Sequence, residues 1–446
     1  MTSLEVDLLI VGAGPAGLAA AVEARTHGLS VLLLDENPTP GGRIWQALEQ
    51  RGAEDSEEDA GLDLIRQFHA CGAVSQFQAT VWAIEPDGQV FWSIGHSARV
   101  SRARMILLAT GTTERPVPIQ GWTVPGVMTV GAAQIALKAS GLVPERSTWI
   151  AGQGPLVLLY AVQALRAGGD IAGIIDLSAS TRLSALRHLP GALRSLGDLA
   201  RGIAWRRAIA KAGVPWIRAD ALRAEGEDGL RRLVIASHGQ ERVEPADTLL
   251  LHDGVMPSVQ LTRALGCIHA WHETSRHWYP ITDTWGATSV PGVHVAGDGA
   301  GIEGAKAAAV GGRLAALGIA GAVGRLDLAR RDAAARPLLA ARRKLLAIRA
   351  LLDALYPPLR IPIADATLVC RCEEVSAGDI RRAVLLGCLG MNQLKAYSRC
   401  GMGPCQGRTC GAIAAEVIAE SRGLPPQVVE PLRTRFPIKP LRLGEL

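Results

Sequence analysis

Several signals are missing from this sequence of 446 residues, and each absence narrows what the protein does. No apolar run approaches the ~18 residues of a membrane-spanning helix, so we expect no membrane span. The N-terminus lacks the basic-then-apolar pattern of a secretion signal, so we expect a cytoplasmic protein. The net charge is only +5, too small to indicate a nucleic-acid partner. Repeats and low-complexity segments are also missing, which leaves an ordinary globular chain.

The composition indicates an α/β protein with many turns. Hydrophobic residues make up 48% of the chain and charged residues 20%. The 50 glycines suit tight turns and close approaches of the backbone to ligands. At this length the chain is expected to hold two or three domains.

A Gly-rich motif stands near the N-terminus, directly after the apolar run Val6–Val11, which is expected to form a buried strand. The motif consists of Gly12, Gly14, Pro15, Ala16 and Gly17, and it opens an Ala-rich helix. In a dinucleotide-binding fold the first glycine makes the turn and the second lets the backbone approach the pyrophosphate. The third allows close packing of helix on strand. The strand-turn-helix context makes this a strong nucleotide signal.

An acidic residue follows at the expected distance. The second strand, Val31–Leu34, ends in Asp35, which lies 18 residues after Gly17. Its carboxylate would accept the ribose hydroxyls, with Glu36 beside it.

Later segments of the sequence favour FAD over NAD as the bound nucleotide. They resemble the flavin-contacting segments of flavoproteins with two dinucleotide-binding domains. Val81 is expected to touch adenine, and Asp298 to hold the ribitol chain. A helix over 299–324 would face the flavin. The segments are Gly42 with Arg43, the strand end Ala109, Thr110 and Gly111, and Gly297 with Asp298.

A second Gly-rich turn, Gly152 to Gly154, predicts a second dinucleotide fold. Val157 stands where the third glycine belongs, and its branched side chain would separate the helix from the strand. NAD(P) binding is therefore doubtful. We expect a vestigial fold that holds another adenine nucleotide or nothing.

Six of the eight cysteines lie between Cys370 and Cys410. A C-x-C pair followed some thirty residues later by a second pair is typical of a 2Fe–2S domain, since thiolates are the ligands of such clusters. Zinc is the alternative, because four cysteines suit it as well. A disulfide is less favoured without a secretion signal.

The second pair can be drawn from three cysteines. Between Cys372 and Cys405 lie 32 residues, and between Cys372 and Cys400 lie 27. The stretch resembles the bacterioferritin-associated-ferredoxin-like domain, whose gap is near the larger value. That resemblance implies the ligands Cys370, Cys372, Cys405 and Cys410, with Cys400 as a spare thiol.

These elements predict an α/β fold with two dinucleotide-binding domains, the second inserted in the first, and a small helical cluster domain. The expected parts are an FAD-binding domain at 1–118 and 277–325, an inserted NAD-like domain at 119–276, a helical linker at 326–364, a 2Fe–2S domain at 365–425 and an extended tail at 426–446. The basic helical segment 181–212 is expected to pack on the second domain, with a peripheral contact to the inner face of the membrane as the alternative.

The chain resembles, over nearly its whole length, the α (A) subunit of heteromeric opine oxidases and D-hydroxyproline dehydrogenases, and it is similar to the B subunit of hydrogen cyanide synthase. The resemblance rests on His252–Pro257, Trp285 with Gly286, Gly297–Gly301 and Arg399–Gly407. It implies a partner β subunit, similar to glycine or sarcosine oxidase, that oxidises an amino acid, imino acid or opine. Further implied possibilities are FMN at the subunit interface and a small γ subunit. This chain would then carry no catalytic residue and would pass electrons toward the respiratory chain.

Three other functions stay open. The first is a stand-alone NAD(P)H-dependent ferredoxin-type reductase, against which Val157 argues. The second is a subunit of hydrogen cyanide synthase that serves glycine oxidation. The third is a regulatory sensor without turnover. Cys71 and Cys267 are isolated, so the flavin is not expected to reduce a neighbouring dithiol.

Overall fold

The first Gly-rich motif lies beside a seven-stranded sheet. The computed structural model describes residues 4–144, 146–178, 183–192 and 195–445. Across this sheet the strands are β3 (Val74–Gln76), β2 (Val31–Leu34), β1 (Leu4–Val11), β6 (Ser97–Leu108), β5 (Gln89–Ile94) and β4 (Thr80–Ile84), and β19 (Val293–Val295) pairs with the end of β6. The strands β1, β2, β3, β19 and β6 run parallel, while β5 and β4 form an antiparallel extension.

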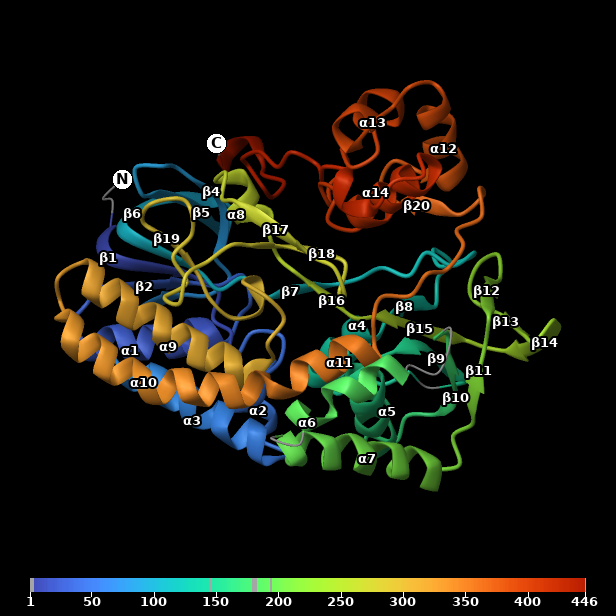
Figure 1. Ribbon diagram of the computed structural model, residues 1–446, viewed down its shortest axis with the longest axis horizontal. Helices are drawn as coiled ribbons and strands as arrows, with labels where there is room; N and C mark the ends of the chain where they lie inside the picture. Colours follow the sequence, from blue (N-terminus) through green and yellow to red (C-terminus); the bar gives the residue numbers. More distant parts are fainter. Residues whose placement is uncertain (1–3, 145, 179–182, 193–194, 446) are drawn as a thin grey trace.

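Helices cover one face of the parallel part of the sheet, and the apolar residues of β1 and β2 are divided between two hydrophobic cores. In Figure 1, α1 (Pro15–Thr26), α9 (Ala305–Ala322) and α10 (Leu328–Leu345) are stacked on one side of it. The close crossing of α1 and α9 depends on Gly312, whose Cβ would lie 2.0 Å from the Ala16 carbonyl oxygen. Also in this part of the chain are α2 (Leu48–Arg51) and α3 (Ser56–Ala70).

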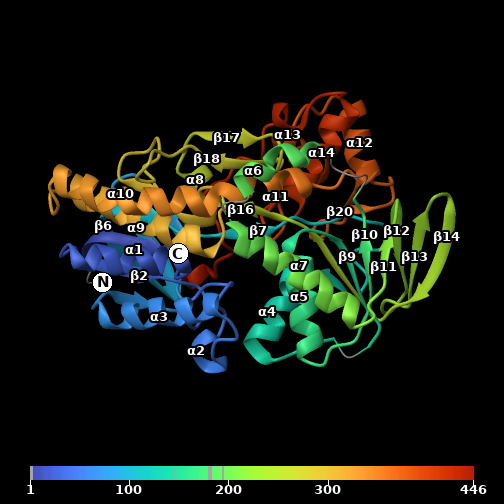
Figure 2. The same cartoon turned by 60° about the horizontal axis from the view of Figure 1, so that its bottom comes forward.

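A second parallel sheet follows in the middle of the chain. Its order is β11 (Trp216–Arg218), β10 (Ile171–Asp176), β9 (Thr148–Gln153), β15 (Thr248–Asp253) and β8 (Val127–Thr129). The helices α4 (Val130–Ser140), α5 (Pro155–Arg166) and α7 (Leu196–Lys211) lie beside it (Figure 2). A three-stranded antiparallel sheet extends from its edge: β12 (Ala221–Glu225), β13 (Arg232–Ser237) and β14 (Gln240–Pro245).

Short strand pairs join the two halves. They are β7 (Thr112–Glu114) with β16 (Val255–Pro257), and the hairpin of β17 (His269–His272) and β18 (His277–Pro280). The short helix α8 (Gln260–Ala264) lies between them in sequence. The fold is therefore the predicted pair of dinucleotide-binding folds.

Two helical segments differ in detail from their prediction. The segment 181–212 forms η1 (Leu183–His188), α6 (Leu189–Ala192) and α7, while 181–182 and 193–194 lie outside the described residues. The helix expected at 299–324 begins only at Ala305, after η3 (Gly297–Gly299). Its start is delayed because Gly304 has φ of +85° and because the Asp298 carboxylate accepts hydrogen bonds from the backbone N–H groups of Glu303 and Gly304.

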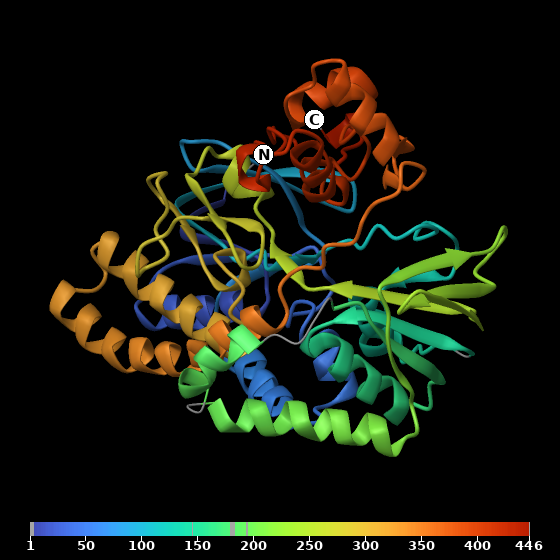
Figure 3. The ribbon, with the colours of Figure 1, turned by 45° about the vertical axis from the view of Figure 1, so that its right-hand side comes forward.

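The C-terminal part is a small helical unit on one side of the molecule (Figure 3). The linker ends with η4 (Leu346–Ile348) and α11 (Arg349–Leu355), after which the chain runs without regular structure to β20 (Leu368–Cys370) and β21 (Val375–Ser376). The helices α12 (Ala377–Leu385), α13 (Met391–Ser398) and α14 (Cys410–Ser421) enclose a core that includes Cys370, Cys400 and Cys410. The described part of the tail, 426–445, contains η5 (Pro426–Val428) and η6 (Leu443–Glu445). Within the described ranges, no helix is both long and apolar enough to cross a bilayer.

Candidate functional site

A cavity of about 350 Å³ opens beside the first Gly-rich turn. Nearly all residues that were predicted from the sequence to bind FAD line this cavity. The predicted residues on its wall are Gly12, Gly14, Pro15, Ala16, Asp35, Glu36, Gly42, Arg43, Val81, Ala109, Thr110, Gly111 and Asp298. The other two, Gly17 and Gly297, lie behind the wall and shape it.

Each glycine of the first Gly-rich turn is needed for a different structural reason. Gly12 has φ of +109°, and a Cβ there would lie 2.4 Å from the Ala109 carbonyl oxygen. A Cβ on Gly17 would lie 1.9 Å from the Gly12 carbonyl oxygen, so this glycine lets α1 pack against the turn. No atom of the described residues lies within 4 Å of a Cβ built on Gly14, which leaves the backbone open to a ligand. These are the three roles that a pyrophosphate-binding turn requires.

Asp35 is buried at the end of β2 and is fixed by backbone hydrogen bonds. Its carboxylate accepts from the backbone N–H of Ala13 and from both the backbone and side-chain amides of Asn37. Burial raises the pKa of Asp35, while these hydrogen bonds oppose the shift. A carboxylate has about four acceptor sites, and the hydrogen bonds from Asn37 use both sites of Oδ1, so Oδ2 of Asp35 can still accept from one ribose hydroxyl.

Asp298 also lines the cavity, in the turn before α9. Its Oδ1 atom accepts from the backbone N–H groups of Glu303 and Gly304, at 2.8 and 2.9 Å. Burial raises the pKa of Asp298, and these hydrogen bonds lower it in part. The other oxygen, Oδ2, has capacity to accept from the hydroxyls of a bound ligand.

Sequence reasoning missed the contribution of the C-terminus to this wall. Arg408, Ile438 and Lys439 line the cavity together with the predicted residues. Nothing in the sequence links residues so distant from Gly12. Lys439 Nζ lies 2.7 Å from Glu36 Oε2, and although burial by itself would raise the pKa of Glu36, this hydrogen bond holds it below its usual value.

The second Gly-rich turn is contacted by the chain itself. Gln153, between its two glycines, donates from Nε2 to the carbonyl oxygen of Pro357 at 2.5 Å and to Asp253 at 3.0 Å. Asp253 in turn accepts from the backbone N–H of Leu359. Val157 is 1% exposed and packs in the core between α5 and the second sheet. The linker residues thus lie against the turn where a nicotinamide nucleotide would bind.

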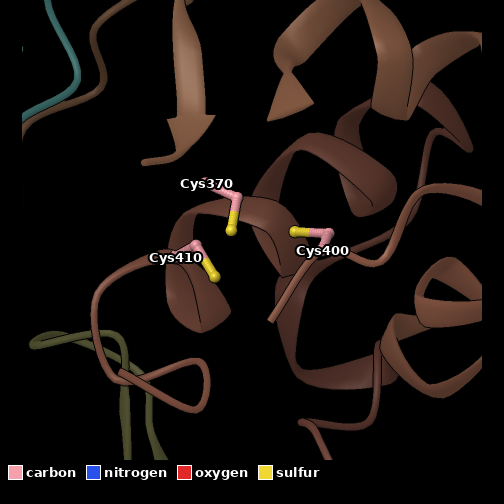
Figure 4. A group of neighbouring side chains, drawn as sticks. All are labelled: Cys370, Cys400 and Cys410. Carbon is pink, nitrogen blue, oxygen red and sulfur yellow. The ribbon is translucent and has the colours of Figure 1, made fainter. Parts of the chain in front are cut away.

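Three buried cysteines point toward one another at the base of the C-terminal unit (Figure 4). The sulfur atoms of Cys370, Cys400 and Cys410 all lie within 4.8 Å of one another. Cys400, which sequence reasoning set aside as a spare thiol, therefore belongs to the same group as Cys370 and Cys410. The folding of the loop 399–410 brings it there, and cysteine spacing alone does not reveal this.

The other two predicted ligands lie on the outer side of this group. The Cys405 thiol contacts those of Cys410 and Cys372. The contact with Cys410, together with the backbone N–H groups of Thr409 and Gly407, lowers the pKa of Cys405. Gly403 presses against Cys372, since a Cβ there would lie 2.1 Å from Cys372 Cβ. Five thiols are thus available to a cluster that needs four.

Cys388 is also buried in this unit, but its sulfur atom lies 3.5 Å from the carbonyl oxygen of Gly390. It takes no part in the group.

Comparisons with known proteins agree with this arrangement. Residues 6–312 match the family model of pyridine nucleotide-disulphide oxidoreductases, and residues 364–446 match the sarcosine oxidase A3 domain. The opine oxidase A subunit from Rhizobium meliloti is 42% identical over 460 residues, which cover 99% of this chain and 87% of that protein. This chain belongs to the family of opine oxidase A subunits.

The family resemblance inferred from the sequence is thereby confirmed. The chain is an oxidoreductase of a flavoprotein family, and its relatives are named as subunits of larger enzymes. Hydrogen cyanide synthase subunit HcnB from Pseudomonas aeruginosa is 32% identical, with 97% of this chain and 96% of that protein covered. Among solved structures, L-proline dehydrogenase from P. horikoshii superposes with a TM-score of 0.72 and 18% identity, covering 100% of this chain and 80% of that one. That last likeness shows the fold alone.

Proposed function

We propose that this opine oxidase family member is an electron-transfer subunit that holds FAD in the cavity and a 2Fe–2S cluster at the C-terminal cysteines. The observation that carries the proposal is that one chain joins a dinucleotide cavity to a group of thiols. Arg408 belongs to both, because it lines the cavity and donates to the carbonyl oxygen of Cys405 at 3.1 Å.

The residues of each site suit their cofactor. Asp35 and Asp298 present carboxylates to the ribose and ribitol hydroxyls, and the Gly12–Gly17 turn presents a bare backbone to the pyrophosphate. We assign the cluster to Cys370, Cys372, Cys405 and Cys410. The backbone N–H groups of Gly407 and Thr409 at Cys405 support this choice, since such donors stabilise a ligating thiolate.

Electrons would enter this chain from a partner subunit that oxidises an amino acid, imino acid or opine. A bound flavin accepts electrons in pairs and releases them singly, which suits a junction between amine oxidation and a one-electron cluster. Among the described residues, no cysteine lines the cavity, so the residues at the flavin include no dithiol to reduce.

The proposal is tested by comparing electron donors anaerobically. The isolated chain mixed with NADH or NADPH should keep its flavin absorbance for minutes. The complex with its partner should bleach when given D-hydroxyproline, octopine or nopaline. Rapid bleaching of the isolated chain by NADH would instead support a stand-alone ferredoxin-type reductase.

Glycine is an informative fourth substrate, because the similarity to HcnB favours hydrogen cyanide synthase as a second candidate function. Bleaching by glycine with release of cyanide would select it. Bleaching by any of these substrates without the partner would show that this chain has its own catalytic site.

A further inference from the structure

The C-terminal tail lines the cavity at the end expected to hold the adenosine of FAD. Ile438 and Lys439 line the cavity together with Glu36 and Val81, the residues expected next to the ribose and adenine. The tail is anchored there by a backbone hydrogen bond of 2.9 Å, from the Ile438 N–H to the carbonyl oxygen of Trp82 on β4. This segment therefore adds a piece of wall to a site formed by residues some 400 positions earlier.

Apolar packing anchors the tail in addition to this backbone hydrogen bond. The Ile438 side chain is 5% exposed and packs in the core formed by β1, β2, β4 and β5, with Phe436 packed against the same core. Because this side chain is buried as deeply as the strand residues, the adjacent Lys439 is held in a fixed place. From there its ammonium group reaches Glu36 at 2.7 Å.

The cluster loop is tied to the same segment. Arg408 donates from one guanidinium nitrogen to the carbonyl oxygen of Cys405 and from the other to the carbonyl oxygen of Ile438. The Gln406 side chain donates to the carbonyl oxygen of Pro437 at 3.1 Å. One guanidinium group thus contacts a proposed cluster ligand, the tail and the cavity.

We propose that Arg408 and Lys439 form a cationic clasp on the adenosine diphosphate half of FAD, supplied by the cluster loop and the tail. This inference deepens the proposed function and rests on it. The ligand chemistry fits, because this half of FAD carries the two phosphates and the ribose hydroxyls, which cationic donors bind. An Arg guanidinium also stacks on aromatic faces such as that of adenine.

The clasp has a thermodynamic consequence. If Arg408 contacts both the cluster loop and FAD, then loss of the cluster weakens FAD binding. By linkage, loss of FAD then weakens cluster retention by the same factor. The two cofactors are therefore coupled through one side chain.

The first experiment measures the affinity of FAD for the full-length protein stripped of flavin, by quenching of flavin fluorescence. Lys439→Ala should weaken binding roughly tenfold, the effect of losing one charge-assisted hydrogen bond. Arg435→Ala is the matched control, because Arg435 is an exposed cation on the same tail, and it should bind FAD like the parent. An unchanged FAD affinity in Lys439→Ala would overturn the clasp.

Competing ligands separate the two halves of the site. ADP should displace FAD from the parent protein, and Lys439→Ala should weaken the binding of ADP by the same factor as the binding of FAD. Riboflavin lacks the adenosine diphosphate half, so its affinity should change equally little when Arg408 or Lys439 is replaced. If the parent protein binds neither FAD nor ADP, the proposed function fails; if it binds both and the variants do so equally, only the clasp fails.

The second experiment tests the coupling. Visible absorbance of the cluster is followed during exposure to a chelator, with and without saturating FAD. FAD should slow the bleaching of the parent protein and of Arg435→Ala, and it should have much less effect on Arg408→Ala and Arg408→Lys. If FAD protects the cluster equally in all four proteins, Arg408 does not transmit the coupling. Circular dichroism of each variant checks that it is folded.

Discussion

Arg276 Nη2 lies 3.2 Å from Glu416 Oε1, and this pair joins the β17–β18 hairpin region to the helix that begins at Cys410. Arg115 also approaches Glu416, at 3.7 Å, and donates to the carbonyl oxygens of Ser275 and Arg276. Burial raises the pKa of Glu416, while the two arginines oppose that shift. The C-terminal unit is therefore held on the flavoprotein body by the half-buried charge of Glu416, whose side chain is 26% exposed.

Removal of this charge should loosen the C-terminal unit. In Glu416→Ala, Arg115 stays buried without its carboxylate, which costs roughly 3 kcal/mol. Limited proteolysis of the linker 357–364 should become faster, and the midpoint of thermal unfolding should fall. Glu420→Ala, which removes an exposed carboxylate from the same helix, is the control. Equal proteolysis rates in the two variants would show that Glu416 does not fix the unit.

The cluster ligands are tested one cysteine at a time. Cys370→Ser, Cys372→Ser, Cys405→Ser and Cys410→Ser should each abolish the visible iron–sulfur absorbance, because four thiolates hold a 2Fe–2S cluster. Cys400→Ser should keep it, and Cys388→Ser serves as a buried control. If Cys400→Ser bleaches the protein and Cys405→Ser does not, Cys400 replaces Cys405 as the ligand, as its position beside Cys370 and Cys410 allows.

The flavin contacts are tested by cofactor content. Asp35→Ala removes the acceptor for a ribose hydroxyl, worth roughly 1.5–3 kcal/mol. Asp298→Ala removes the ribitol contact. Both proteins should purify with less FAD per chain, as measured by absorbance after denaturation. Asp87→Ala, in an exposed turn, should keep the parent content. Unchanged FAD content in both site variants would mean that the cavity holds another ligand.

Acid should destabilise the chain through His277. Burial, with a smaller effect of nearby cations, lowers its pKa from 6.5 to about 3, and its Nδ1 atom has no hydrogen-bond partner among the described residues. The folded state therefore stays neutral where the unfolded chain takes up a proton, so stability is lost as pH falls below about 6.5.

Urea unfolding measures this loss. Between pH 7 and pH 5 the free energy of unfolding should fall by about 2 kcal/mol on account of this one group. His277→Phe should reduce the difference between the two pH values, and His69→Phe, at an exposed histidine, should leave it as in the parent. An unchanged difference in His277→Phe would show that His277 ionises normally in the folded protein.

Local patterns in the sequence were sufficient for the first nucleotide fold. The strand Val31–Leu34, the helix that the Gly-rich motif opens and the cavity position of Asp35 all follow from short-range rules, because the glycines and the acid act within neighbouring strands and turns. The domain boundaries, the cofactor contacts and the ligand set stay predictions.

The sequence by itself determined the fold class, the family and the residues that form the turn, since each depends on neighbours a few positions apart. Only the tertiary structure decided which distant segments meet. The approach of Lys439 to Glu36, of Cys400 to Cys370 and of Pro357 to Gln153 depends on how whole units pack. The physical reason is that such contacts are set by the burial of apolar surface between units, such as Ile438 against β4, and this surface has no local periodic signature.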